Sequence, residues 1–339
     1  MSFRIRAARN DDFKALYEMA KLTGGGFTNL PADKGALVEK LVRSEEAFAR
    51  DSGGQGDDLF VFMLEDVATG RVRGTCQVFS HVGTDTPFYS YRITTLSQTS
   101  KELGRTFRAE MLNLVTDFDG CSEVGGLFLH PQARAGGLGM LLARSRYLFI
   151  RQHRERFAGK VLAELRGVID EGGNSPFWDA IAGRFFGMTF READEFNAMH
   201  GTQFIADLMP KTPIYTAMLT DDARKVMGVP HPSGRAAMKM LEADGFSFDG
   251  YIDIFDGGPT MAAATDRIRT VAGAREEVLA EVSDSEGGQP MLVATGRLAD
   301  FTACWARMRT EPDGRVFLDS NSAALLGLEP GDRFVASPR

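Results

Sequence analysis

A glycine-rich turn between an apolar strand and a helix is the clearest chemical signal in the chain. The apolar run Leu127–Leu129 leads through His-Pro-Gln-Ala into Arg134-Ala135-Gly136-Gly137-Leu138-Gly139, and a helical pattern begins there. Glycines let a backbone approach a phosphate closely, and the free N–H groups at a helix N-terminus point at it. The sequence therefore predicts an anion site at this turn. The competing interpretation is a plain glycine turn before a solvated helix.

The sequence of the turn excludes two common nucleotide-binding motifs. A Walker A loop needs Gly-Lys-Ser/Thr, which is absent, and the dinucleotide fingerprint G-x-G-x-x-G is not matched because the glycine order is reversed. Residues 134–160 carry seven basic side chains and one acidic one, within a chain of net charge −7. We expect this basic stretch to suit a ligand that carries several phosphates, and the acidic remainder to suit a cationic substrate.

Composition narrows the class of protein further. A chain of 339 residues with 43% hydrophobic residues predicts about two domains and a sizeable core. The net negative charge argues against nucleic acid as a partner. Three separated cysteines and five scattered histidines, without an HExxH pair, predict neither a disulfide framework nor a metal site. No signal-peptide core or membrane-length apolar run is present, so we expect a cytoplasmic enzyme without a membrane partner.

Alternating strand and helix patterns must position the turn. Period-two and helical spacings predict a strand at 3–7, a helix from 13, a helix over 33–50 and a hairpin of 59–64 with 73–80. Further strands are expected at 121–130 and 161–168, and helices at 138–157, 175–186 and 231–243. Residues 273–289 are polar enough to predict a linker or loop. The order predicts a mixed α/β (α+β) fold.

The strand, turn and helix resemble the acyl-CoA-binding motif of the GNAT superfamily of N-acyltransferases. More specifically, ordered blocks up to about residue 260 resemble the arginine N-succinyltransferase family. They include Lys21-Leu22-Thr23-Gly24-Gly25-Gly26-Phe27-Thr28-Asn29-Leu30-Pro31, Ala163-Glu164-Leu165-Arg166-Gly167, Val229-Pro230-His231-Pro232 and Tyr251-Ile252-Asp253-Ile254-Phe255-Asp256-Gly257-Gly258. The resemblance implies a GNAT-like fold over residues 1–260 and a C-terminal extension, small and β-rich, over residues 261–339.

This resemblance implies an activity and assigns roles to individual residues. The activity is transfer of succinyl from succinyl-CoA, a co-substrate rather than a tightly bound cofactor, to the α-amine of L-arginine. His231 is implied as the catalytic residue, acting as acid or base, although between two prolines it also fits a plain helix start. The cofactor site implied is Leu127, Phe128, Leu129, Arg134, Ala135, Gly136, Gly137, Leu138 and Gly139.

The amino-acid pocket is less defined by the sequence. The succinyl carboxylate calls for an arginine fork, and Arg92 and Arg166 are the candidates, with an ordinary ion pair as the alternative for each. The substrate guanidinium calls for a carboxylate, for which Glu164 is the candidate beside Asp170, Glu171, Asp253 and Asp256. Gly125 and Gly126 predict a β-bulge that turns backbone N–H groups around Leu127 toward an oxyanion.

Two alternative functions stay open on the sequence alone. One is a non-catalytic acyl-CoA-binding subunit that pairs with an active relative, and the other is the same chemistry on ornithine. In either case the family resemblance implies a homo-oligomer or a hetero-oligomer with a related subunit.

Overall fold

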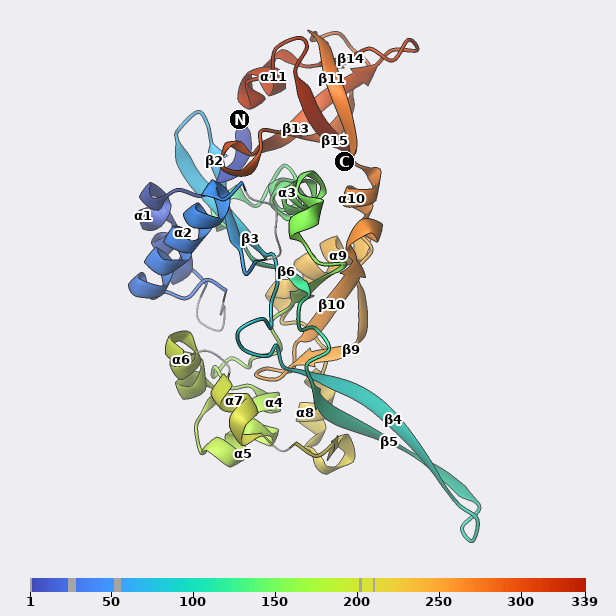
Figure 1. The fold of residues 1–339 in the computed structure, drawn as a ribbon. Helices are drawn as coiled ribbons and strands as arrows, with labels where there is room; N and C mark the ends of the chain where they lie inside the picture. Colours follow the sequence, from blue (N-terminus) through green and yellow to red (C-terminus); the bar gives the residue numbers. More distant parts are fainter. Residues whose placement is uncertain (1, 24–28, 52–55, 201–202, 210) are drawn as a thin grey trace.

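A computed structural model of the chain describes residues 2–23, 29–51, 56–200, 203–209 and 211–339. Figure 1 shows a central sheet with helices against it, a β-rich unit at one end and a long hairpin projecting from the other. The predicted mixed α/β class is confirmed. Among the helices described, none combines the length and apolarity needed to cross a bilayer.

The central sheet runs in the order β1–β2–β3–β6–β7–β10–β9–β4–β5–β8. Neighbouring strands pair antiparallel except β6 and β7, which are parallel. The strands are β1 (Phe3–Ala7), β2 (Leu59–Asp66), β3 (Arg71–Phe79), β4 (Ser90–Ser100), β5 (Arg105–Val115), β6 (Ser122–Leu129), β7 (Lys160–Glu164), β8 (Ile214–Tyr215), β9 (Ser247–Asp253) and β10 (Pro259–Ala264). The predicted hairpin is β2–β3, turning at Gly70 with φ +66°.

Helices cover both faces of this sheet. They are α1 (Phe13–Lys21), α2 (Lys34–Ala49), α3 (Leu138–Gln152), α4 (Pro176–Ala180), α5 (Ala182–Phe186), α6 (Phe190–His200), α7 (Gln203–Leu208), α8 (Asp221–Val226) and α9 (Arg235–Ala243). The helix predicted over 175–186 is two short helices, because Ile181 leaves helical geometry (φ −120°, ψ −89°). The helix predicted at 231 begins at Arg235, after a 3₁₀ turn.

Side-chain alternation along β2 explains how the two layers pack. Its even residues, including Phe60 and Phe62, join Phe48 of α2 and Phe149 of α3 in one aromatic core, with ring centroids 4.8 to 5.7 Å apart. Its odd residues pack under α1 and α2 instead. A strand buried on both faces reads as a continuous apolar run, which is how Leu59–Leu64 appears in the sequence.

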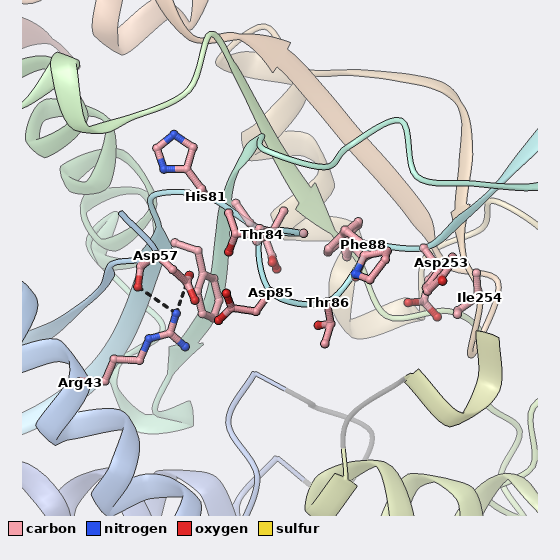
Figure 2. A pocket seen from close by; sticks show the side chains of 16 residues that line it. Arg43, Asp57, His81, Thr84, Asp85, Thr86, Phe88, Asp253 and Ile254 are labelled. Atoms are coloured by element: carbon pink, nitrogen blue, oxygen red, sulfur yellow. Dashed lines mark hydrogen bonds and ion pairs between the residues drawn. The ribbon is translucent and has the colours of Figure 1, made fainter. Parts of the chain in front are cut away.

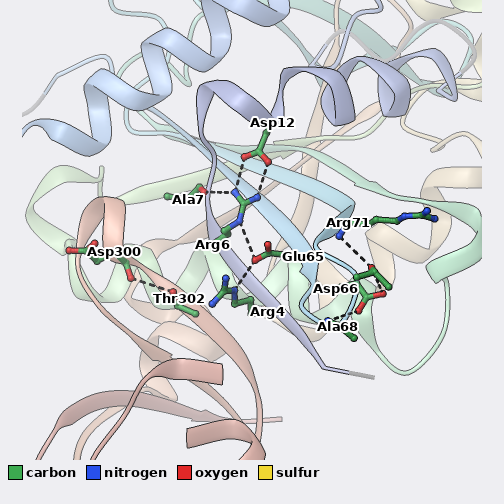
Figure 3. A network of polar contacts seen from close by, with 11 residues as sticks. Arg4, Arg6, Ala7, Asp12, Glu65, Asp66, Ala68, Arg71, Asp300 and Thr302 are labelled. Carbon is green, nitrogen blue, oxygen red and sulfur yellow. Dashed lines mark hydrogen bonds and ion pairs between the residues drawn. The ribbon is translucent and has the colours of Figure 1, made fainter. Parts of the chain in front are cut away.

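An ion-pair network ties the first strand to the helix that follows it (Figure 3). Arg6 donates to both carboxylate oxygens of Asp12 at 2.7 and 2.8 Å, and its Nε donates to Glu65 on β2 at 3.3 Å. Asp12 also accepts the Arg9 backbone N–H at 2.9 Å, so it caps the short turn before α1. Because Arg6 and Asp12 are both buried, losing either partner would leave a buried charge alone.

The C-terminal part forms a closed ring of strands. β11 (Arg275–Val282), β12 (Gln289–Thr295), β13 (Thr302–Thr310), β14 (Val316–Leu318) and β15 (Arg333–Pro338) pair in the order β12–β15–β11–β14–β13, and β13 pairs back with β12. Helices α10 (Arg269–Gly273) and α11 (Ser320–Leu326) flank it. The loop predicted over 273–289 is confirmed for residues 283–288. Its first part is wrong, because β11 is a strand whose polar residues face outward.

Candidate active site

Strand β6 carries the predicted bulge. Its register with β3 runs Gly74 to Leu129 and Thr75 to Phe128, then jumps to Gln77 opposite Gly125, so two residues of β6 oppose Cys76. Gly126 takes φ +57° to allow this, a conformation that glycine adopts without strain. The bulge therefore lifts the Gly126–Leu127 peptide out of the regular ladder, as predicted.

On its other edge, β6 separates from β7 soon after they meet. Their parallel register consists of Ser122 with Val161 and Glu123 with Leu162. Strand β7 continues beside β10 through Glu164. The part of β6 that holds the bulge therefore faces a gap in the sheet rather than a ladder with β7.

The glycine turn lies directly beyond this strand. Gly136 and Gly137 both have positive φ, +65° and +79°, and Gly137 is the N-cap of the 15-residue helix α3. Arg134 is exposed and its Nε donates to the Leu129 carbonyl at 3.3 Å. The side chain of Phe128 is buried under α1 and α2, so only the backbone of this residue is available to a ligand.

The basic stretch after the turn serves the fold, contrary to the expectation from sequence. Arg144 lies 3.6 Å from Asp244, Arg154 pairs with Asp266 at 2.7 Å and Arg156 pairs with Asp58 at 2.8 Å. Buried Arg146 donates to the Ala143 and Gly125 carbonyls. These four guanidinium groups are engaged within the protein, so they are not free to bind a phosphate.

His231 stands beside the end of β7. Leu165 N–H donates to Pro259 on the β10 side, and successive peptide groups of an extended strand point to opposite edges. The next carbonyl, of Arg166, therefore points toward the edge that β6 has left, and it accepts the His231 N–H at 2.7 Å. The catalytic candidate thus lies on the same edge of β7 as the gap.

Local hydrogen bonds set the tautomer of His231. The Ser233 backbone N–H donates to Nδ1 at 3.2 Å, and the Ser233 hydroxyl lies 2.7 Å from the same atom. A backbone N–H can only donate, so Nδ1 is an acceptor and the neutral ring carries its proton on Nε2. Partial burial and the nearby charge of Arg166 lower the pKa of His231. The imidazole is therefore mainly neutral at pH 7, with Nε2–H available.

The two arginine candidates have different surroundings. The Nε of Arg166 is buried and has no hydrogen-bond partner among the described residues, and burial lowers the pKa of this guanidinium. Arg92 on β4 is half-exposed, lies 3.7 Å from Asp117 and covers the Tyr251 ring at 5.4 Å. Only Arg166 adjoins His231 and shows an unmet hydrogen-bonding group.

A cavity of about 320 Å³ opens beside the same strands and is rich in carboxylates (Figure 2). It is lined by Asp57, Asp85, Glu123, Glu164 and Asp253, together with Arg43, His81 and uncharged residues of the 79–89 loop. Asp57 is neutralised by Arg43 at 2.6 Å at one end of the cavity. The other carboxylates also line the cavity, and the lining residues include no second arginine to pair with them.

Glu164 is poorly compensated. Among the described residues, its carboxylate accepts one hydrogen bond, from the Thr260 hydroxyl at 3.5 Å. Burial, and then the charges of Asp253, Glu123 and Asp256, raise its pKa well above the ordinary value. Burial also raises the pKa of Glu123 and that of Asp256 to about 7. These carboxyl groups therefore either carry negative charge or hold a proton. A cation bound among them would be stabilised by their ionised form.

The remaining acidic candidates are used by the backbone. Asp256 accepts the Gly167 and Gly258 N–H groups at 2.7 and 2.8 Å, and Asp253 accepts those of Phe255 and Asp256. Asp170 is exposed and accepts the Asn174 N–H. Within the described ranges, no group of three or more His, Cys, Asp or Glu side chains is arranged to hold a metal ion.

Sequence reasoning missed Glu123. An acidic residue next to the apolar, glycine-containing run of β6 was the available signal, because a buried carboxylate in such a strand needs a reason.

The glycine triplet Gly24–Gly26 predicts either a loop that closes over the substrate or a plain turn of the chain. These residues lie outside the described part of the structure.

Models of one protein family match nearly the whole chain. The model described as arginine N-succinyltransferase beta subunit matches residues 3–270, and that of its C-terminal domain matches residues 274–338. Arginine N-succinyltransferase subunit beta of Pseudomonas aeruginosa is 40% identical over 336 residues, 98% of this chain and 97% of the relative. Arginine N-succinyltransferase of Citrobacter koseri is 41% identical over 331 residues, 97% and 95% of the two chains.

A solved structure is similar over the same length. The arginine/ornithine succinyltransferase subunit AI from Pseudomonas aeruginosa superposes with a TM-score of 0.90 at 32% identity, covering 99% of this chain and 98% of that chain. The predicted GNAT-like fold with a C-terminal extension is confirmed.

Proposed function

The chain belongs to the arginine N-succinyltransferase beta subunit family, and from this premise we propose that it transfers succinyl from succinyl-CoA to the α-amine of L-arginine. The observation that carries the proposal is the bulged, open edge of β6 leading into the glycine turn of α3. The thioester lies along this edge with its carbonyl at the Leu127 N–H. The pyrophosphate lies on Arg134–Gly139, where the first N–H groups of α3 are unpaired within the helix.

The reaction needs three proton movements. The arginine α-ammonium loses a proton to solvent, and its nitrogen attacks the thioester carbonyl to form a C–N bond and an oxyanion. The nitrogen then loses a second proton, collapse of the oxyanion breaks the C–S bond, and the CoA thiolate takes up a proton. His231 delivers a proton to the thiolate from Nε2, which is where the Ser233 hydrogen bonds leave it, and is re-protonated by the proton that the nitrogen loses.

The charged ends of the two substrates have matching groups. Arg166, with its unpartnered Nε beside His231, holds the succinyl carboxylate. The carboxylates of the cavity, Glu164 above all, receive the guanidinium of the amino acid. Arg92 already has an ion pair with Asp117, and its contact with substrate stays a prediction.

A thiol-release assay tests the function. Succinyl-CoA and acetyl-CoA are each combined with arginine, ornithine and lysine, and free CoA is measured. We expect the fastest release from succinyl-CoA with arginine, and slower release with ornithine, whose shorter ammonium side chain cannot pair bidentately. Absence of amine-stimulated release from either thioester would favour the non-catalytic subunit. Faster release with ornithine would favour the second alternative.

Arg166→Ala tests the acyl specificity. Loss of a charge-assisted hydrogen bond costs about 1.5–3 kcal/mol, so we expect the kcat/KM preference for succinyl-CoA over acetyl-CoA to fall about 10- to 100-fold. Arg92→Ala tests the other candidate in the same way, and a preference within about two-fold of the parent would remove Arg92 from the pocket. An unchanged preference in Arg166→Ala would remove that residue from the pocket.

We also propose that the chain works in an assembly with itself or with a related subunit. Relatives are named as subunits, and the β4–β5 hairpin projects into solvent with Leu103 and Phe107 more than half exposed. A two-stranded ribbon of this kind is marginal in water without a partner. Sedimentation of the purified chain, alone and with a related subunit, checks this; monomers alone in both cases would contradict it.

A further inference from the structure

A buried polar network lies directly against the bulge of β6. Lys40 of α2 donates from Nζ to the Asn29 carbonyl at 2.6 Å and to Gln77 Oε1 at 2.7 Å. Gln77 Nε2 donates to Asn29 Oδ1 at 2.9 Å, and Asn29 Nδ2 donates to Glu123 Oε1 at 3.2 Å. The network thus links α2, the loop before it, β3 and the start of β6.

The amides of this network pack on the two glycines of the bulge. A Cβ atom added at Gly125 would lie 2.7 Å from Asn29 Nδ2, and one added at Gly126 would lie 2.9 Å from the Gln77 amide. Contacts this short leave no room for a methyl group on either residue. The Asn29 and Gln77 side chains therefore rest on the backbone that orients the Leu127 N–H.

The location of the network does not follow from packing alone. Gln77 is 2% exposed and sits on the face of β3 covered by α1 and α2, where the neighbouring cluster is apolar. Four side chains with donors, acceptors and charges at such a place cost desolvation energy that apolar residues would avoid. Their hydrogen bonds fix one rotamer for each amide and so one shape for the bulge.

We propose that Asn29 and Gln77 are positioning residues that hold the Gly126–Leu127 peptide at the angle needed to donate to the thioester oxyanion. This inference rests on the proposed function, because the oxyanion arises only in acyl transfer. Among the described residues, the hydrogen bonds of the network do not reach the turn Arg134–Gly139, so we expect the network to act on the chemical step and to leave cofactor binding to the turn.

Gln77→Leu tests the proposal, because it removes both polar atoms of the side-chain amide at nearly constant volume. Removing an oxyanion donor costs about 10²–10³ in kcat, so a misaligned one should cost about 10- to 100-fold. We expect that loss in kcat, with the KM for succinyl-CoA and the affinity for free CoA within about two-fold of the parent. Gly126→Ala, which forces a side chain against Gln77, should lower kcat at least as far.

Ser44→Ala is the matched control for loss of stability. Ser44 lies on the same helix as Lys40, is 1% exposed and accepts the Val61 N–H at 3.0 Å, away from the bulge. It should lower the melting temperature as much as Gln77→Leu while leaving kcat within about two-fold. If folded Gln77→Leu keeps its kcat, or if Ser44→Ala loses as much, the positioning role is wrong. If the parent protein itself shows no transfer, the proposed function is what fails.

Discussion

Replacing His231 with alanine is expected to lower kcat by about 10²–10⁴-fold, the usual contribution of a positioned acid or base. The backbone of His231 lies beside the end of β7, where its N–H donates to the Arg166 carbonyl. Without Nε2–H, the leaving thiolate takes its proton from water. Because the turn Arg134–Gly139 is untouched, the affinity for free CoA, measured by calorimetry, should stay within about two-fold.

The chain contains a matched control for this substitution. His130 also precedes a proline, caps a 3₁₀ turn and accepts from the N–H two residues on, at 3.3 Å, with backbone angles close to those of His231. His130→Ala should keep kcat within about two-fold, since the hydrogen bond of its ring in the described structure is to Gln132 of its own turn and not to the end of β7. A loss of CoA affinity in His231→Ala as large as the loss in kcat would point to a structural role instead.

The glycine turn and the bulge could be predicted because both are local. Glycine at positions 126 and 137 indicates in the sequence that the backbone can take positive φ there, as it does in the structure. The strand before the turn is indicated by its run of apolar residues. The gap beside β6 could not be predicted, since it depends on how β7 aligns with β10, a strand about a hundred residues further along. Open edges follow from sheet order, which single-strand patterns do not contain.

The basic stretch shows where charge counting fails. Arg144 and Arg156 are buried against Asp244 and Asp58, which lie about a hundred residues away in the sequence. A run of arginines therefore looked like a free basic face, although its counter-charges were supplied by other elements. The same limit hid Glu123, whose role depends on Asn29 and on the neighbouring Glu164.

Glu164→Gln is expected to change stability and activity in opposite directions. In the ligand-free protein, burial, and then the charges of Asp253 and Glu123, raise the pKa of Glu164. The native state therefore binds a proton that the unfolded chain releases, and this contribution to stability is lost as pH rises above the unfolded pKa of about 4.3. Glutamine does not titrate, so the free energy of unfolding of the variant does not decrease with rising pH on account of this residue.

The stability half of this prediction has a defined pH dependence. At pH 4, below the unfolded pKa, Glu164 is mainly protonated in both the folded and the unfolded state, so the variant and the parent should melt within about 1 °C. At pH 8 the variant should be more stable by about 1–3 kcal/mol, the usual cost of a buried group left without its partner. Glu171→Gln, an exposed carboxylate in the same sequence block, should show no gain at either pH.

The activity half follows from the same carboxylate. If Glu164 receives the guanidinium of arginine, the amide loses a charge-assisted hydrogen bond worth about 1.5–3 kcal/mol, and the KM for arginine should rise about 10- to 100-fold. The KM for succinyl-CoA should not move. A stabilised variant with an unchanged KM for arginine would show that the cavity tolerates the buried charge for another reason. A destabilised variant would show that the carboxylate already has its partner within the fold. A gain in stability together with a loss of arginine binding is what distinguishes a site built for a cation that arrives with the substrate.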